Sequence, residues 1–307
     1  MFRPFFSFCR PPTRAPACIP ACTAALLAAL CGTPAQAEGP VQAGPDVDAD
    51  VKPPTPKPLW ELGVGVAGLR VPDYRGSDQN HGYVLPVPYF VYRGTWLKAD
   101  RDGARALLFD TDRVKVDVSL AASTPTSSSD NRARQGMPDL PAVVEIGPNL
   151  NLTLAGSRAA HWKLDLRLPV RGAVTVQRSP EYIGMTFSPN LNLDLAGVAG
   201  GWDLGLLTGP LFADRKYQQH FYSVDAIYAT PDRPAYQAHG GYGGWQALAA
   251  TSRRFGNMWV GGFVRYDTLH GAAFDDSPLV RRQSAVSFGF GISWILKTSS
   301  ELVNSGE

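Results

Sequence analysis

Residues 138–176, PDLPAVVEIGPNLNLTLAGSRAAHWKLDLRLPVRGAVTV, decide the fold class. In both halves, apolar and polar residues alternate with a strict period of two, which places them on opposite faces of β-strands. The joint at 155–160 contains Gly156 and Ser157, so the two strands are predicted to form a hairpin. The strands run about 13 and 15 residues, longer than is usual in soluble sheets. At about 3.3 Å per residue and a tilt near 45°, about 13 residues cross roughly 30 Å, the thickness of a bilayer core.

The same alternation recurs along the chain. It is clean at 60–67, 114–122, 183–195 and 284–296, and weaker in four Gly-rich segments at 202–212, 221–229, 236–252 and 259–269. Together these segments give about twelve strands, no convincing amphipathic helix and aromatic residues near strand ends, which is typical of a transmembrane antiparallel β-barrel. The alternative is a large soluble sandwich or jelly roll, whose strands would be shorter. The sequence therefore predicts an all-β outer-membrane barrel.

Two segments leave alternatives open. The strand at 83–92 contains Pro86 and Pro88, which remove ladder donors on the same side, so it is either irregular or poorly paired on one side. Residues 96–109 contain Asp102 and Gly103, which either turn the chain between two short strands or bulge one long strand. This choice sets the strand parity, and hence the side on which each later loop lies.

The first 37 residues read as an export signal that is cleaved. Three arginines precede a short apolar stretch, and Ala35-Gln36-Ala37 resembles a cleavage site. A lipoprotein anchor at Cys31 is the lesser alternative, because Leu30 stands where a small residue is needed. We expect a Pro-rich periplasmic tail at 38–58, the barrel at 59–296 and a C-terminal extension at 297–307, the last because thirteen residues follow the final aromatic, Trp294.

Composition argues against disulfides, metal sites, nucleic-acid binding and catalysis. All four cysteines lie in the signal, so the mature chain has no disulfide and no thiolate site. Removing the signal lowers the net charge from +2 to −1, which gives no basic field for nucleic acid. The histidines form no metal-binding spacing, so neither a metal nor a cofactor is expected, and the protein is not expected to be an enzyme. An outer-membrane hydrolase built on His161 or His220 is a remote alternative.

Charged side chains cannot face lipid cheaply, since an arginine at the bilayer midplane costs about 2–4 kcal/mol. The polar faces of the strands should therefore point into the lumen and pair across strands. The candidate lumen-facing residues are Glu145, Asn149, Lys163, Asp165, Arg167, Arg171, Asn190, Asn192 and Asp194. Such a set predicts either a plug of ion pairs or a charged passage.

A series of short motifs resembles the MipA/OmpV family of Gram-negative outer-membrane proteins from about Trp60 to Leu296. The motifs are Pro72-x-Tyr74-x-Gly76-Ser77, the Pro-rich second strand, the segment 136–141 before Glu145-x-Gly147-Pro148, Leu168-Pro169-Val170-Arg171, Gly209-Pro210 with Asp214-Arg215-x-Tyr217, Phe221-Tyr222-x-Val224 and 275–278. The resemblance implies an outer-membrane barrel. It also implies a scaffold that joins a murein lytic transglycosylase to a penicillin-binding protein, and other members are porin-like.

Two functions follow from these observations. The first is a scaffold whose periplasmic face binds murein-remodelling enzymes, and the second is a porin-like channel for small solutes. A barrel of about twelve strands lies between filled and open examples, so strand number does not decide between them. The candidate partner-facing loop, conditional on strand parity, is Met137, Pro138, Asp139, Leu140 and Pro141.

Overall fold

The computed structural model describes residues 56–93, 97–100, 103–106, 109–111, 113–157 and 160–303. The strands are β1 (Lys57–Pro58), β2 (Trp60–Pro72), β3 (Asn80–Arg93), β4 (Leu97–Asp100), β5 (Gly103–Ala106), β6 (Phe109–Asp110), β7 (Val114–Ser123), β8 (Ala142–Ser157), β9 (Trp162–Val176), β10 (Tyr182–Phe187), β11 (Asn190–Gly197), β12 (Trp202–Ala213), β13 (Gly241–Phe255), β14 (Met258–Thr268), β15 (Ser284–Thr298) and β16 (Leu302–Val303). The helices are α2 (Val198–Gly201), α3 (Arg215–Tyr222) and the 3₁₀ turn η1 (Ala226–Tyr228).

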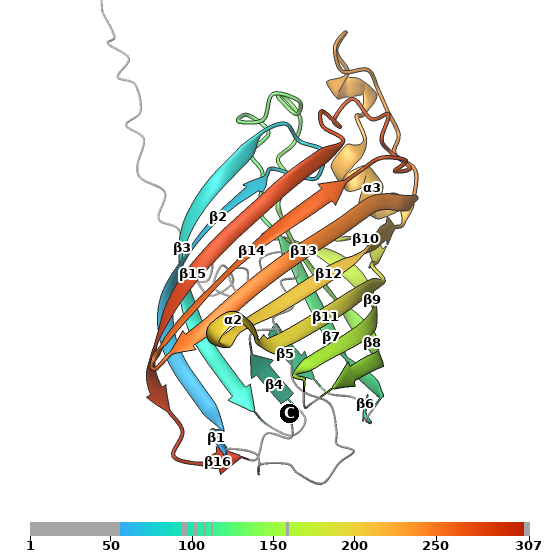
Figure 1. The fold of residues 1–307 in the computed structure, drawn as a ribbon. Coiled ribbons are helices and arrows are strands. Elements are labelled where there is room, and N and C mark those ends of the chain that lie inside the picture. The colour runs from blue at the N-terminus through green and yellow to red at the C-terminus, as the bar shows by residue number, and fades with distance from the viewer. Residues whose placement is uncertain are drawn as a thin grey trace, which may run out of the picture.

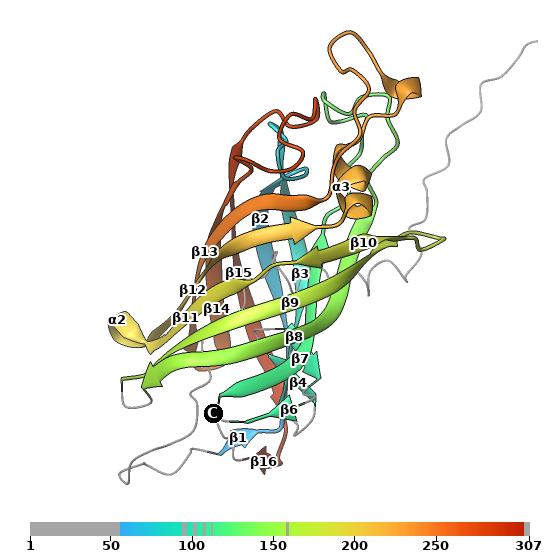
Figure 2. The ribbon, with the colours of Figure 1, turned by 90° about the vertical axis from the view of Figure 1, so that its right-hand side faces the viewer.

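Fourteen of these strands form one antiparallel sheet that curls into a barrel (Figures 1 and 2). Its hydrogen-bonded path starts at β5, runs through β4, β3, β2, β15, β14, β13, β12, β10, β9, β8 and β7, and ends at β6. β5 and β6 are neighbours in the chain and β5 also contacts β7, so the path returns to its start. With β5 and β6 counted as one wall segment, and β10 and β11 as another, the described residues give twelve segments. The predicted barrel is confirmed.

Burial follows the period of two that the sequence shows. In β9, every second residue from Asp165 to Thr175 is buried, while the residues between them are partly exposed. On the outer surface, large apolar side chains are exposed, among them Val64, Ile146 and Phe290. A surface that is apolar outside and polar inside suits a strand with lipid on one face and a lumen on the other.

The two ends of the barrel differ. At one end lie both ends of the described chain, where β1 pairs with β16, and short turns such as 256–257 (Figure 1). At the other end lie the long connections 73–79, 124–141, 214–240 and 269–283 (Figures 1 and 2). Outer-membrane barrels have short periplasmic turns and long extracellular loops, so we call the first end periplasmic and the second extracellular.

Two strand predictions in the 221–252 region were wrong. Residues 221–229, predicted as a strand, end helix α3 and form η1, and the strand predicted from 236 begins only at Gly241. Helix α3 is capped at its N-terminus by Asp214, whose side chain accepts a hydrogen bond from the Tyr217 amide at 2.8 Å. The apolar residues that suggested a strand are instead packed in an extracellular cap, as described below. Among the described residues no helix is long and apolar enough to cross a membrane.

Both open alternatives near the second strand are resolved. Asp100 pairs with Gly103, so the chain turns there and makes two short strands, while Trp96 lies outside the described residues. β3 is regular and pairs with β2 along its whole length from Asn80 to Tyr92. On its other side, as far as the described residues show, it pairs with β4 at Tyr92 and Arg93 alone, so it is the poorly paired strand of the two alternatives.

The predicted export signal and most of the predicted tail lie outside the described residues. Where the tail enters the structure, Lys57 and Pro58 pair with Val303 and Leu302 of the predicted C-terminal extension. The amide of Leu59 donates to Glu301 O at 2.9 Å and the amide of Ser299 donates to Trp60 O at 2.8 Å. The two segments that flank the barrel are thus joined to each other at its periplasmic end.

Candidate functional site

At the periplasmic end of the lumen, one buried carboxylate holds two arginines. Glu61 of β2 is 1% exposed. Arg93 Nη2 donates to its Oε1 at 2.9 Å, and Arg254 Nη1 donates to its Oε2 at 2.9 Å. Arg93 Nη1 also donates to the carbonyl of Pro58 at 2.7 Å. This cluster therefore ties β1 to the barrel wall through three wall strands, β2, β3 and β13.

The middle of the lumen contains a network of buried polar side chains on β7, β8, β9 and β11. The amides of Asn149 and Asn151 donate to the two carboxylate oxygens of Asp117, each at 3.0 Å. On the neighbouring strands, Lys163 pairs with Asp165 at 2.8 Å and Arg167 with Asp194 at 3.6 Å. Asn192 Nδ2 also donates to Asp194 at 2.7 Å.

The nine predicted lumen residues lie on the inner side of this wall. Asn149, Asp165, Arg167, Arg171, Asn190, Asn192 and Asp194 are buried, and Glu145 and Lys163 are partly buried. Eight of the nine make side-chain contacts with one another or with neighbouring elements, and the ninth, Asn190, donates to the carbonyl of Ser188 at 2.9 Å. Arg171 of β9 donates to Ser119 Oγ at 2.8 Å and to Ser188 Oγ at 3.0 Å.

Closer to the extracellular end, the lumen meets the loops. Glu145 of β8 accepts hydrogen bonds from Thr186 of β10 and from Tyr217 of helix α3, both at 2.8 Å. On the opposite wall, Asp267 accepts from Arg265 at 2.8 Å and from Arg75 of the β2–β3 loop at 3.0 Å. Loop groups thus reach down into the barrel and bind strand carboxylates.

Above these contacts, an apolar cap closes the extracellular end. It consists of buried side chains from four loops and the strand tops: Tyr74, Ala133, Leu140, Val143, Ala173, Ile183, Phe221, Tyr222, Val224, Ala238, Leu269, Ala272, Phe274 and Leu279. Phe274 is 0% exposed and stacks on Tyr222 with ring centroids 3.7 Å apart. Tyr74 OH donates to Leu279 O at 2.8 Å, and Ser277 Oγ donates to Tyr222 O at 2.7 Å.

Two buried arginines fasten the cap by binding backbone carbonyls. Arg134 donates to Phe221 O at 3.1 Å, and Arg233 donates to Ala133 O at 3.0 Å and to Gln135 O at 2.9 Å. Each arginine therefore joins the 124–141 loop to the 214–240 loop. Burial lowers the pKa of Arg134, and the neighbouring Arg233 acts in the same direction.

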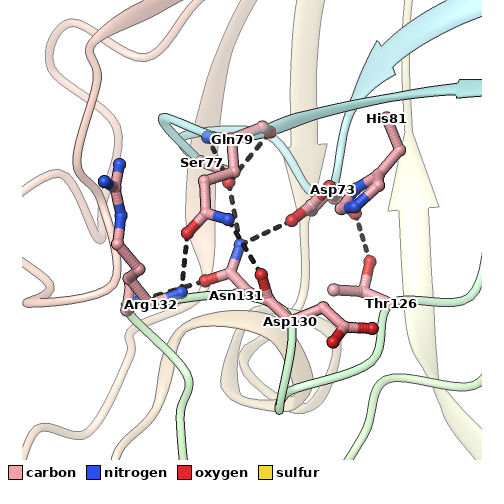
Figure 3. Close-up of polar contacts among 9 residues, drawn as sticks. Asp73, Ser77, Gln79, His81, Thr126, Asp130, Asn131 and Arg132 are labelled. Atoms are coloured by element: carbon pink, nitrogen blue, oxygen red, sulfur yellow. Dashed lines mark hydrogen bonds and ion pairs between the residues drawn. The ribbon is translucent and has the colours of Figure 1, made fainter.

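The 73–79 loop and the 124–141 loop are held together by a polar clamp, shown in Figure 3. Asp73 binds Asn131 Nδ2 at 2.7 Å through a carboxylate oxygen and Thr126 Oγ1 at 2.6 Å through its carbonyl. The other carboxylate oxygen binds the ring of His81. Gln79 completes the clamp, since its side chain donates to Asp130 O at 2.8 Å and accepts from the Arg132 amide at 2.6 Å.

The tyrosines and the histidine of the cap are held in their neutral forms. Burial raises the pKa of Tyr222 to about 12, and burial together with Glu145 raises the pKa of Tyr217 well above its usual value. Burial and the nearby Arg134 lower the pKa of His220, whose ring packs edge-on against Phe221 at 4.9 Å. Neutral groups suit a cap that excludes water.

Beneath the cap lies a cavity of about 500 Å³. One side of it is lined by the inward side chains of β3, namely Tyr83, Leu85, Val87, Tyr89 and Val91. Other parts are lined by 121–125 of β7 and the following loop, by Arg75 and by Gln246. The β3 wall is apolar, whereas the β7–β11 side of the lumen is polar.

The five predicted partner-loop residues belong to the extracellular end. Leu140 is buried in the cap and Met137 packs against it, Pro138 and Asp139 are exposed, and Pro141 is partly buried. The Pro138 carbonyl accepts from Ser128 Oγ at 2.6 Å and Asp139 accepts from the Ser128 amide at 2.7 Å. This loop lies at the end of the barrel opposite to the β1–β16 pair, so it is not placed to meet a periplasmic enzyme.

The two histidines singled out for a hydrolase lie in different parts of the structure. His161 is in the short turn before β9 with a φ of 53°, and His220 is in the cap. The described histidine that contacts a carboxylate is His81, and that carboxylate, Asp73, serves the clamp. Within the described residues, no group of three or more His, Cys, Asp or Glu is placed to hold a metal ion.

Sequence reasoning missed Glu61, Arg75, Tyr217 and Asp267 as lumen groups. Glu61 carried a usable signal, because it is the charged residue on the polar face of a clean strand. Arg75 and Tyr217 carried none, since they come from a loop and a loop helix that fold back into the barrel. Such contacts join residues up to 192 positions apart, as between Arg75 and Asp267, and the periodicity of a short segment cannot predict them.

A family model described as "MltA-interacting protein MipA" matches residues 64–296. No curated protein matches the chain. Among solved structures, the chain is similar to a bacterial polysaccharide outer membrane secretin, with a TM-score of 0.39 and 8% identity over 77% of this chain and 99% of the other. It is also similar to a Pseudomonas aeruginosa FadL homologue, with a TM-score of 0.30 and 8% identity over 78% and 91%. A third likeness is to the Ralstonia pickettii toluene transporter TbuX, with a TM-score of 0.21 and 10% identity over 79% and 70%.

Proposed function

The chain belongs to the MltA-interacting protein MipA family, and from this premise we propose that it is a scaffold for murein-remodelling enzymes. Its family and its barrel place it in the outer membrane. The proposed partners are a murein lytic transglycosylase and a penicillin-binding protein, and the family's description supports a partner in that it names interaction with MltA. Both would dock at the periplasmic face.

The observation that carries the proposal is the apolar cap over the extracellular end. A channel for small solutes needs a water-filled passage between its two mouths. Here Val224, Phe274 and Leu279 are 0% exposed, and buried arginines join the loops around them. The polar lumen residues are largely buried and paired with each other. These features favour a closed barrel that displays a surface over a porin-like channel.

The periplasmic docking surface that we favour is the β1–β16 pair. It projects from the barrel wall and is anchored by Arg93 on one side and by the Ser299 amide on the other. Leu302 is 57% exposed on this pair. A two-stranded sheet leaves unpaired backbone edges, which an extended segment of a partner can join by strand addition.

Capture of the two enzymes by the protein in lipid nanodiscs tests the proposal. The matched variants are Leu302→Ser at the periplasmic end and Ile227→Ser at the extracellular end, where the native residue is 83% exposed. We expect Leu302→Ser to weaken capture about tenfold, since an exposed apolar anchor contributes on the order of 1–2 kcal/mol, and Ile227→Ser to leave capture unchanged. Unchanged capture by Leu302→Ser, or failure of the wild type to capture either enzyme, would overturn the proposed docking of these enzymes at the β1–β16 pair.

Conductance in planar bilayers separates the scaffold from the channel. We expect no stable unitary openings for the wild type, because the cap closes one end. Removal of the ring in Phe274→Ala leaves a hole at the centre of the cap and should produce openings, whereas Phe290→Ala on the lipid face, 66% exposed in the native protein, should not. Stable openings of the wild type that shift with Arg167→Ala would instead support the channel.

A further inference from the structure

One edge of β3 is unpaired over most of its length in the part of the chain that the structure describes. β3 pairs with β2 from Asn80 to Tyr92, but on its other edge it pairs only at Tyr92 and Arg93. Across the gap, β7 pairs with β6 at Lys115 and Val116 on the facing side. The wall of the barrel is thus interrupted between the upper parts of β3 and β7.

The sequence itself disfavours pairing at the middle of this edge. The amide of Arg93 donates to Leu59 O, on the β2 side, and alternate residues of a strand point their amides to opposite neighbours. The nitrogens of Pro86 and Pro88 therefore point away from β2, to the open edge, where proline offers no donor. Proline in a sheet is confined to positions of this kind. An open edge within the hydrocarbon region is otherwise costly, because its polar groups have no water.

Contacts at both ends of the gap hold its two sides in place. At its extracellular end, the polar clamp of Figure 3 joins the loop before β3 to the loop after β7 through Asp73 and Asn131. At its periplasmic end, β4 pairs with Tyr92 and Arg93. We call the framed gap the lateral window. It faces lipid, since Val84 and Phe90, the outward residues of β3, are 78% and 51% exposed.

The cavity behind the lateral window is lined on both of its sides. The inward residues of β3 from Tyr83 to Val91 form the apolar wall, and residues 121–125 line the cavity on the β7 side of the window. At about 3.3 Å per residue, the β3 wall spans roughly 26 Å. That length and a cavity volume of about 500 Å³ suit one long acyl chain, and the volume lies in the usual range for small-ligand sites.

At the extracellular end of this wall, polar atoms lack partners. Arg75 Nη2 and Gln246 Nε2 are buried without a hydrogen-bond partner, and both residues line the cavity. They lie close together, since Arg75 binds Asp267 and Gln246 pairs in register with Asp267 across β13 and β14. Buried donors without partners are costly, and a ligand carboxylate would satisfy both at a place where Arg75 and Arg265 share the carboxylate of Asp267.

We propose that the cavity binds a single-chain carboxylate amphiphile of the fatty-acid class, which enters from the outer leaflet through the lateral window. Its carboxylate binds Arg75 and Gln246 beneath the clamp, and its chain lies along the inward face of β3. This site is independent of enzyme docking at the periplasmic end. The bound ligand would place an acyl chain beside the unpaired edge of β3. Its carboxylate would accept hydrogen bonds from Arg75 Nη2 and Gln246 Nε2.

Photolabelling of the full-length mature protein in nanodiscs tests this site. The probe is a palmitic acid that carries a diazirine in its chain, with mass spectrometry to locate the labelled residues. We expect saturable labelling at inward residues of β3 and at 121–125, which unlabelled palmitate suppresses. Labelling spread equally over inward and outward residues of β3, with no competition, would overturn the proposal.

Paired variants test the two halves of the ligand. Leu85→Gln faces the cavity and Val84→Gln, on the same strand, faces lipid, so we expect about tenfold weaker binding for the first and less than twofold change for the second. Arg75→Met and Gln246→Leu should each weaken binding of the acid but not of its methyl ester. Gln246→Leu keeps the other contacts of Arg75 intact, so it serves if Arg75→Met does not fold. Equal binding of acid and ester, or equal effects at 84 and 85, would contradict the assignment.

A phospholipid arm separates a free fatty acid from a membrane lipid. Phosphatidylethanolamine with the same diazirine chain is expected to label outward residues without saturation and to leave the cavity residues unlabelled. Saturable labelling of the cavity by the phospholipid at equal concentration would overturn the carboxylate assignment.

Discussion

Asn131 donates from its side-chain amide to the carboxylate of Asp73 at 2.7 Å, although 58 residues separate them in the chain. Asn131 is 0% exposed, and the same amide also donates to Ser77 Oγ at 3.1 Å. The contact joins the loop that leads into β3 to the loop that follows β7. It therefore holds together the two strands whose edges do not pair.

Substitution of this residue should weaken the clamp. Asn131→Ala leaves a buried carboxylate without one of its donors, which costs about 1–3 kcal/mol or more. We expect a lower midpoint of urea unfolding in lipid vesicles. Arg132→Ala is the control, because its ion pair with Asp78 is exposed and such pairs contribute little. Equal midpoints for the two variants would show that the loops are held by other contacts.

Glu61 is the carboxylate that pairs with both Arg93 and Arg254. Its removal should therefore lower the stability of the barrel more than the loss of the side-chain volume alone would. Glu61→Ala leaves two guanidinium groups beside a buried site, and breaking a buried pair costs about 3–5 kcal/mol. Glu61→Gln retains an acceptor and should cost less. Unfolding of the variants can be followed by the temperature at which the barrel loses its compact migration on gels. The exposed Glu301→Ala should migrate as wild type does.

The prolines of β3 give a prediction about hydrogen exchange. In Pro86→Ala/Pro88→Ala, two new amides point to the unpaired edge, whereas the amides of Leu85 and Val87 point to β2. In detergent micelles, where water reaches an unpaired edge more readily than in a bilayer core, we expect faster exchange at positions 86 and 88 than at 85 and 87, together with lower stability. Slow exchange at all four positions would mean that a further strand covers this edge and that there is no lateral window.

The cap should lose stability in mild acid through His220. Its pKa is lowered in the folded protein, so the unfolded chain binds more protons below its ordinary pKa of about 6.5. The folded state is then disfavoured progressively as the pH falls from about 6.5 towards the lowered pKa, and this effect is absent above pH 7. Unfolding midpoints between pH 7.5 and 5 should fall less for His220→Gln than for wild type. Parallel curves for both would assign the acid sensitivity to other groups.

Local sequence predicts the parts of this protein that depend on local geometry. The alternation at 138–176 identifies β8 and β9, their membrane length and the inward side of Glu145, Asp165 and Arg167, because a pleated strand sends successive side chains to opposite faces. The same reasoning fails at Phe221 and Tyr222. Their apolar character comes from burial in the cap, and burial by itself does not distinguish a strand from a short helix.

The sequence by itself predicted the barrel, and through Pro86 and Pro88 it limited the second strand to an irregular or a one-sided pairing, since each depends on the covalent chemistry or period of a short segment. Only the tertiary structure decided that the extracellular end is capped, that residues 137–141 lie away from the periplasm, and that Asp73 and Asn131 frame a lateral window. These features arise where loops that are distant in sequence contact each other. Long-range packing stabilises such contacts, and the pattern of a short segment does not predict them.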